Sequence, residues 1–250
     1  MTASLIRIGC GGFPVGRGAY FKHFQTVEID STFFNLPRLE TAQRWRQEAP
    51  RQFEYSMRAW QLITHPPSSP TYRRLSRQVP VKVRERCGHF KPNDETIAAW
   101  EATCRVAQAL KPKFLVFQTP TSFYPSADHL RNMYRFFKSL VRGPIQFVWE
   151  PAGNSWRPPL IARVCADLGL VHGMDPLMVG MVRPGVKYFR LQGRLEGARI
   201  RRSFRYTDEE LNDLLERCQG SFAYVYFNNI AMWEDAQRFQ DKAAACGARK

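Results

Sequence analysis

The sequence lacks the long apolar run of a membrane-spanning helix, because none of its hydrophobic stretches approaches about 18 residues. Its first residues, MTASLIRIGCGG, contain neither a basic segment nor a long apolar one, so we expect no secretory signal. None of the six cysteines belongs to a CxxC pair, and their wide spacing disfavours zinc and iron–sulfur sites. We therefore expect a cytoplasmic protein with reduced, mostly buried cysteines and no membrane partner.

Several catalytic motifs are also absent. The chain has no GxSxG elbow of a serine hydrolase and no Walker-type phosphate loop. None of its five histidines ends a predicted strand, which further disfavours a zinc cluster, and we expect His65 to be a solvated loop residue. The glycines of GCGGFPVGRG follow the first predicted strand without a GxGxxG motif in register with a helix, so the signal for a dinucleotide-binding sheet is weak.

What the chain does contain is a regular alternation of short apolar runs and helical stretches. The apolar runs predict eight strands, at 5–10, 26–30, 53–59, 114–120, 145–151, 170–175, 187–193 and 222–229. Helices are predicted at 39–50, 93–110, 126–140, 158–169, 207–218 and 232–246. Mostly continuous apolar strands are typical of parallel strands covered on both faces. We predict an α/β protein with a single (β/α)8 TIM barrel over residues 1–250; a doubly wound open sheet is the alternative.

Polar residues stand at the carboxyl ends of the predicted strands, where a barrel of this kind builds its active site. Glu28 and Asp30 are two residues apart in one predicted strand, so their side chains should share a face. Buried carboxylates need partners, and Arg58 and Arg190 are the expected counter-ions. The polar set comprises Glu28, Asp30, Arg58, Gln118, Glu150, Asp175, Arg190, Gln192, Asn228 and Asn229.

This polar set has two interpretations, a catalytic or binding site and a structural ion-pair network. In the first, acid/base chemistry falls to three carboxylates, Glu150, Glu28 and Asp30. Mg²⁺ or Mn²⁺ would find oxygen ligands in Glu28, Glu150 and Asp175. Substrate would be bound by Arg58, Gln118, Arg190, Gln192, Asn228 and Asn229. In the second, the carboxylates Glu28, Asp30 and Glu150 only form structural ion pairs with the two arginines. Separately, Asp175 and Asn229 have the alternative of a turn or helix-cap role.

The net charge of +15 is concentrated in two segments. Residues 71–91 hold seven Lys or Arg and one Glu, within a long basic loop predicted at about 61–92. Residues 194–205 hold five Arg and one Glu, including the expected phosphate-binding residues Arg201 and Arg202. Both segments follow predicted barrel strands and also contain aromatic residues. Basic side chains bind phosphates, and aromatic side chains stack on bases. We expect a polyanion or phosphate-bearing partner such as DNA or RNA; a generally basic surface is the alternative.

Seven segments, taken together and in order, resemble the YecE-like family, domain of unknown function 72. They are IRIGCGGFP, FQTVEIDSTFFNLPRLETAQRWRQEAP, FLVFQTP, FVWEPAGNSW, YFRLQGR, YTDEEL and YVYFNN, and they span residues 6 to about 240. The resemblance implies a TIM barrel, similar in fold to the xylose-isomerase and endonuclease IV group, in a family whose biochemical activity is not established. It also implies a shared pocket formed by Glu28, Ser31, Thr32, Gln118, Glu150, Arg190, Gly193, Asn228 and Asn229.

The chain departs from the family pattern at two positions. Gln192 stands where the family usually has His, which would alter an acid/base group or metal ligand at that position. Arg58 stands where Lys is common, which keeps the charge but changes its geometry. The sequence therefore predicts an enzyme that acts on a phosphate-containing substrate by hydrolysis or acid/base chemistry. The alternatives are a non-catalytic nucleic-acid-binding protein and an isomerase or lyase of a small sugar phosphate.

Overall fold

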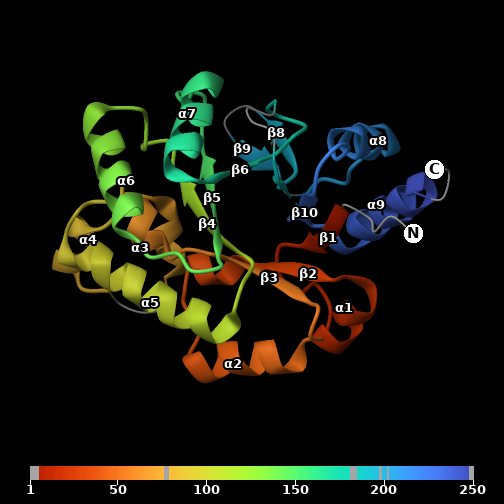
Figure 1. Cartoon of the computed structure of the whole chain (residues 1–250), viewed down its shortest axis with the longest axis horizontal. Helices are drawn as coiled ribbons and strands as arrows, with labels where there is room; N and C mark the ends of the chain where they lie inside the picture. The colour runs from red at the N-terminus through yellow and green to blue at the C-terminus, as the bar shows by residue number, and fades with distance from the viewer. Residues whose placement is uncertain (1–5, 76–78, 181–184, 197–198, 202, 248–250) are drawn as a thin grey trace. The chain divides into compact units, whose positions relative to one another are not determined.

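The computed structural model describes all residues except 1–5, 76–78, 181–184, 197–198, 202 and 248–250. Figure 1 shows the whole chain coloured by residue number. Contacts within the chain define two compact units. The first unit contains Met1–Glu28, Pro50–Glu54 and Gly173–Lys250, and the second contains Ile29–Ala49 and Tyr55–His172. The first unit thus joins both ends of the chain, and one domain over residues 1–250 stays a prediction.

Eight strands make up the main sheet. They are β1 (Ile6–Cys10), β2 (Thr26–Ile29), β3 (Glu54–Arg58), β4 (Phe114–Thr119), β5 (Gln146–Pro151), β6 (Val171–Met174), β7 (Lys187–Leu191) and β10 (Ala223–Phe227). Their order is β1-β10-β7-β6-β5-β4-β3-β2. Gly11, directly after β1, bridges Glu28 of β2 in parallel, so the two ends of this order are also neighbours. The fold is the predicted (β/α)8 barrel, and the open-sheet alternative is wrong.

Helices separate most of these strands. Two predicted helix starts are confirmed: the Asn93 side chain accepts from Thr96 N, and Thr207 and Glu210 form a capping box. The helices are α1 (Arg17–His23), α2 (Leu39–Glu48), α3 (Gln61–Thr64), α4 (Val81–Arg86), α5 (Asp94–Leu110), α6 (Ala127–Ser139), α7 (Pro158–Leu168), α8 (Asp208–Arg217) and α9 (Met232–Gly247), with 3-10 helices η1 (Asp30–Phe33) and η2 (Pro70–Arg74).

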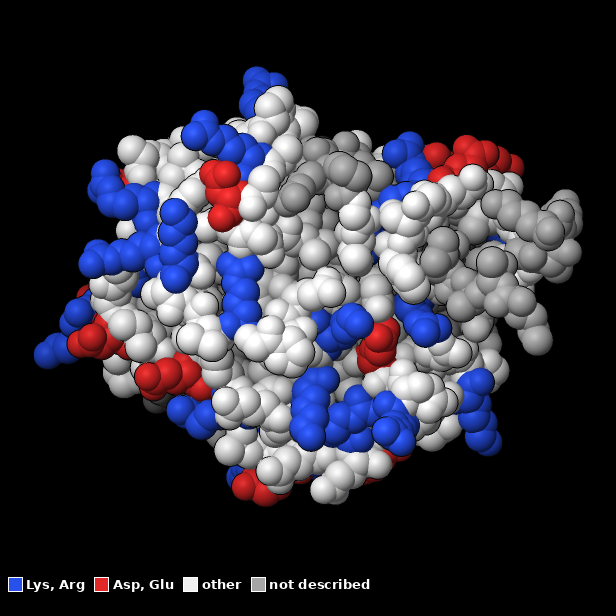
Figure 2. All heavy atoms as spheres, in the orientation of Figure 1, with Lys and Arg blue, Asp and Glu red and all other residues white. Residues whose placement is uncertain are grey.

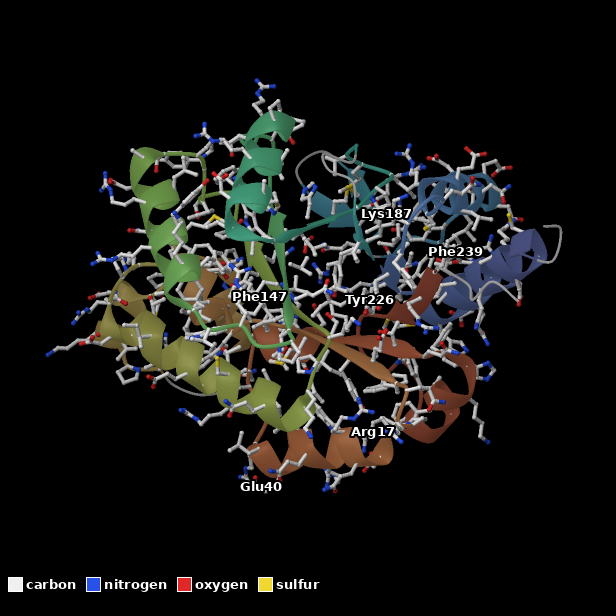
Figure 3. All side chains as sticks on the ribbon, viewed as in Figure 1. Arg17, Glu40, Phe147, Lys187, Tyr226 and Phe239 are labelled. Carbon is white, nitrogen blue, oxygen red and sulfur yellow. The ribbon has the colours of Figure 1, made fainter. Side chains whose placement is uncertain are left out.

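An aromatic core holds α5 and α6 against β4 and β5 in the second unit. Phe117 of β4 lies between Phe137 of α6, at 4.9 Å between ring centroids, and Phe147 of β5, at 5.3 Å. Trp100 of α5 packs on Phe147 at 5.8 Å between ring centroids, and Phe147 is labelled in Figure 3. Since successive strand residues face opposite sides, Gln118 and Glu150 point away from this helical layer.

The first unit requires a glycine where β1 and β2 approach. A Cβ atom at Gly9 would lie 2.2 Å from the carbonyl oxygen of Thr26 and 3.1 Å from the Tyr20 hydroxyl. That hydroxyl accepts from Cys10 N at 2.8 Å and donates to Thr26 O at 2.9 Å, which ties the two strands together. A glycine at this position therefore allows the backbones to come close.

The structure corrects four expectations. Helix α1 lies in a segment for which no helix was predicted. Strand β2 ends at Ile29, and Asp30 begins η1, so Glu28 and Asp30 do not share a strand face. The segment 61–92 is not one long loop, because it contains α3, η2 and α4. Within the basic segment 194–205, β8 (Arg194–Glu196) and β9 (Arg199–Arg201) pair as an antiparallel hairpin.

All six cysteines are free, and four of them are buried, as the sequence predicted. No helix within the described part of the chain is both long enough and apolar enough to cross a membrane.

Candidate functional site

A hydrogen-bonded row of four polar side chains lies in the second unit, at the ends of successive strands. Arg58 Nη1 donates to Asp30 Oδ1 at 2.5 Å, and its Nη2 donates to Gln118 Oε1. Gln118 Nε2 in turn donates to Glu150 Oε1 at 3.3 Å. This polar row, Asp30–Arg58–Gln118–Glu150, joins two carboxylates through a guanidinium and an amide. It lies at the carboxyl ends of its strands, where barrels of this kind build their sites.

The guanidinium of Arg58 is fixed from several sides. Its side chain is 3% exposed, and its Cζ lies 3.9 Å from the centre of the Phe33 ring. Arg58 N donates to Thr32 Oγ1 at 3.0 Å, and the Thr32 hydroxyl donates to Arg58 O at 2.8 Å. A buried cation needs a partner, which Asp30 supplies. Arg58 is therefore the expected counter-ion of Asp30, and it sets the geometry of the row.

His65 lies beside this row and is not the solvated loop residue expected from the sequence. It is 5% exposed, its Nδ1 is 2.8 Å from Thr64 Oγ1, and its ring meets the Phe33 ring edge-on at 4.8 Å. Burial, followed by the nearby charge of Arg58, lowers the pKa of His65 to about 3. The imidazole is therefore neutral at physiological pH and serves as a packed polar residue.

His172 is a residue that the sequence did not single out. It lies in β6, next to Trp149 of β5 in the sheet register. Burial lowers the pKa of His172 to about 4, although the carboxylate of Glu150 acts in the opposite direction. Within the described residues, its buried Nδ1 has no hydrogen-bond partner. The neutral imidazole of His172 therefore interacts electrostatically with Glu150, the carboxylate at one end of the polar row.

In the first unit, Glu28 forms a buried ion pair with Arg190. Arg190 Nε lies 3.0 Å from both carboxylate oxygens, and its Nη2 donates to Oε1 at 2.7 Å. Tyr188 donates its hydroxyl to Oε2 at 2.7 Å. The side chains of Glu28 and Arg190 are 0% and 1% exposed. Arg190 is therefore the expected counter-ion of Glu28.

Further hydroxyl groups extend this polar interior. Thr26 Oγ1 and Tyr226 Oη are 2.8 Å apart, with Tyr226 buried on β10 (Figure 3). Burial raises the pKa of the Tyr226 phenol well above its ordinary value, so it stays protonated. A carboxylate enclosed by donors in this way is suited to holding strands together. The geometry supports the structural interpretation for Glu28 and Arg190, and a catalytic role for Glu28 stays a prediction.

Asn229 joins a second buried network in the first unit. Its Nδ2 donates to Phe204 O and to Asp235 Oδ2, both at 2.7 Å. Asp235, on α9, is fully buried and also accepts from Tyr206 N at 3.1 Å and Arg238 Nη1 at 2.9 Å. This network fixes the turn after β10, which favours the turn role for Asn229. Asp235 gave no signal in the sequence beyond its place in the first turn of a helix.

The other predicted residues of the first unit take varied positions. Asn228 lies against Gly11, where an added Cβ would be 2.6 Å from its Cγ, and within the described residues its buried Nδ2 has no hydrogen-bond partner. Gln192 is buried, with 8% exposure. Asp175 accepts from Leu177 N at 3.0 Å, which is a turn interaction. Arg201 is exposed on β9, and Arg202 lies outside the described residues.

No cluster of three or more His, Cys, Asp or Glu side chains suited to a metal ion occurs in the described parts of the chain. Glu28 is enclosed by Arg190 and Tyr188, and Asp175 accepts from a backbone amide. Mg²⁺ binding by Glu28, Glu150 and Asp175 stays a prediction.

Comparison with known proteins places this geometry in a family. The family described as "Protein of unknown function DUF72" matches residues 18–249. The chain belongs to the DUF72 family. A curated relative, the UPF0759 protein YunF of Bacillus subtilis (strain 168), is 22% identical over 244 residues, which cover 84% of this chain and 79% of the relative.

Solved DUF72 structures share the fold of this DUF72 chain. A DUF72 protein from Enterococcus faecalis V583 is 19% identical with a TM-score of 0.74, over 97% of this chain and 98% of that one. A second, from Thermotoga maritima MSB8, is 18% identical with a TM-score of 0.66, over 95% and 98% of the two chains. At these identities the similarity establishes the fold alone, and function depends on the residues of the site.

More distant structures of the same fold have different names. A xylose isomerase domain containing protein from Salmonella typhimurium LT2 is 12% identical with a TM-score of 0.58, over 93% of both chains. Endonuclease IV from Thermus thermophilus is 12% identical with a TM-score of 0.50, over 95% of this chain and 98% of that one.

Proposed function

We propose that this DUF72 chain is an enzyme that acts on a phosphate-containing substrate by hydrolysis or acid/base chemistry. The observation that carries the proposal is the polar row at the strand ends of the second unit. In the row, Arg58 and Gln118 hold two carboxylates at fixed positions, Asp30 and Glu150. Fixed carboxylates at the carboxyl end of a barrel are the arrangement that proton transfer requires.

Glu150 is the acid/base residue of this proposal. Asp30 forms an ion pair with the Arg58 guanidinium at 2.5 Å. Glu150 accepts from Gln118 Nε2 at 3.3 Å and has 8% exposure. In this scheme Arg58 and Gln118 are positioning residues, and Asp30 neutralises Arg58.

The charge of the chain supports a phosphate-containing substrate. The formal net charge is +15, and Figure 2 shows more Lys and Arg than Asp and Glu on the face that it draws. An excess of positive charge attracts anionic substrates and speeds their encounter. Among structures of similar fold, the name endonuclease IV denotes a nuclease, and the xylose isomerase domain protein suggests a sugar. Both suggestions rest on fold alone.

The test compares turnover in the wild type, Glu150→Gln and the matched control Glu101→Gln, which removes an exposed carboxylate on α5. Labelled DNA and RNA strands and small sugar phosphates are incubated with each protein, with and without Mg²⁺, and products are separated on a denaturing gel or by chromatography. We expect Glu150→Gln to lower turnover by about 10²–10⁴-fold and Glu101→Gln to leave it unchanged. Equal turnover in all three proteins would contradict the assignment of Glu150.

The basic hairpin of the first unit supports a second candidate, a non-catalytic nucleic-acid-binding protein. Arg194, Arg201 and Arg205 are exposed there, and the Arg194 guanidinium lies 4.9 Å from the centre of the Phe204 ring. In this case, neutralising Arg201 and Arg205 would weaken oligonucleotide binding and flatten its dependence on salt. Glu150→Gln would leave the affinity unchanged, and no product would form.

A further inference from the structure

Two consecutive phenylalanines in the second unit, Phe33 and Phe34, each have an arginine guanidinium over the ring. Arg58 Cζ lies 3.9 Å from the centre of the Phe33 ring, and Arg74 Cζ lies 3.6 Å from the centre of the Phe34 ring. The two rings meet at 5.0 Å between centroids with an interplanar angle of 87°. A continuous series of contacts therefore runs from the polar row, through two perpendicular rings, to Arg74.

The backbone around Arg74 is held in place. Arg74 ends η2, whose first turn is capped by the Ser69 side chain. Asn35 Nδ2 donates to Arg74 O at 3.1 Å, and Tyr72 donates its hydroxyl to His65 O at 3.0 Å. Trp60 Nε1 donates to Phe34 O at 3.1 Å, which holds the backbone of the residue on whose ring Arg74 stacks. Arg74 is thus positioned from its own helix and from its aromatic partner.

Arg58 and Arg74 differ in solvent exposure and in ion pairing. Arg58 is 3% exposed and is paired with Asp30. Arg74 is exposed, and within the described residues no carboxylate forms an ion pair with it. Stacking occupies one planar face of a guanidinium and leaves the N–H groups at its edge able to donate. Arg74 therefore presents a pre-oriented, uncompensated cation to solvent.

We propose that Arg74, stacked on Phe34, is a phosphoryl-binding subsite of the proposed active site. This inference rests on the proposed function for its substrate class, and it adds a residue that binds the phosphate away from the acid/base group. A guanidinium edge matches the geometry of a phosphate with two parallel hydrogen bonds. The phosphoryl group can belong to a nucleic acid or to a small sugar phosphate, and the ligands in the test separate these sources.

The competing role for Arg74 is to cover the edge of the Phe34 ring with its aliphatic stem. The variant Arg74→Met distinguishes the two roles, because it keeps an apolar cover and removes the charge. Arg73→Met is the matched control, since Arg73 is the exposed neighbour in η2 and its replacement changes the net charge equally. Arg74→Lys keeps the charge and removes the planar guanidinium.

The experiment measures binding by titration calorimetry at low salt, with pyrophosphate, ribose 5-phosphate and a 5′-phosphorylated oligonucleotide as ligands. We expect the wild type to bind at least one of them, Arg74→Met to weaken that binding at least tenfold, and Arg73→Met to change it less than threefold. Arg74→Lys should fall between them. Melting temperatures of all variants establish that each is folded before binding is compared.

Equal losses in Arg73→Met and Arg74→Met would overturn the subsite, because they would indicate diffuse attraction. Absence of binding by the wild type to all three ligands would overturn it as well. The proposed function fails separately, if Glu150→Gln leaves turnover unchanged while Arg74→Met still abolishes phosphate binding. Conversely, turnover that depends on Glu150 with an unchanged KM in Arg74→Met would remove the subsite alone.

Discussion

The buried pair of Glu28 and Arg190 gives the sharpest prediction about stability. Replacing Glu28 with Gln removes a charge that receives three contacts of 2.7–3.0 Å from Arg190 and one of 2.7 Å from Tyr188. Because Arg190 is 1% exposed, its buried cation would lose the carboxylate of Glu28. Breaking a buried pair in this way costs about 3–5 kcal/mol. For a chain of this size the melting temperature should fall by roughly 6–20 °C.

The assay is urea unfolding followed by circular dichroism, with thermal unfolding as a second measurement. The double variant Glu28→Met with Arg190→Met is the control, because it removes both charges together and leaves neither one unpaired. Its free energy of unfolding should lie closer to the wild type than that of either single variant.

The structural reasoning is refuted if Glu28→Gln unfolds within about 1 kcal/mol of the wild type, the range expected of an ordinary surface position. If turnover also disappears in that stable variant, Glu28 acts in catalysis, which is the other interpretation of the sequence. A large loss of stability would instead make the activity of the variant uninformative about catalysis.

Two further predictions concern backbone contact and protonation. Gly9→Ala would place a Cβ 2.2 Å from Thr26 O and should destabilise the fold by about 3 kcal/mol in urea unfolding. Gly18→Ala, with no atom within 4 Å of the new Cβ, should not; equal effects would contradict the packing argument. The native pKa of His65, about 3, lies below its unfolded value of about 6.5, so the unfolded chain binds more protons and stability falls as the pH drops from about 6.5 towards 3. Between pH 7.5 and pH 5 His65→Gln should lose about 2 kcal/mol less than the wild type, and parallel pH profiles would contradict this.

The strands could be predicted from the sequence to within one or two residues because their apolar runs are short and punctuated. The run LIRIGC, for example, becomes β1 at Ile6–Cys10. Helix α1 could not be predicted, because it has only seven residues and follows a segment rich in glycine, which reads as a turn. Strands β8 and β9 could not be predicted, because their segment is rich in arginine and lacks an apolar run.

The candidate site was predictable as a set of residue types at strand ends, and its pairings were predictable in part. Arg58 and Arg190 were expected as counter-ions, and both form ion pairs. The burial of His65 could not be read from the sequence, since it depends on the ring of Phe33, 32 positions earlier in the chain. Asp235 was missed because one of its partners, the Tyr206 amide, lies 29 positions earlier in the chain.

The polar interior of the first unit also has a consequence for synthesis of the chain. Its hydrogen bonds join residues far apart in sequence: 160 positions separate Glu28 from Tyr188, and 200 separate Thr26 from Tyr226. Such long-range contacts fold slowly, because the loop must close before the contacts form. During translation the N-terminal strands leave the ribosome long before their partners exist. Glu28 therefore stays hydrated in the nascent chain, and the first unit can close only when β10 has been made.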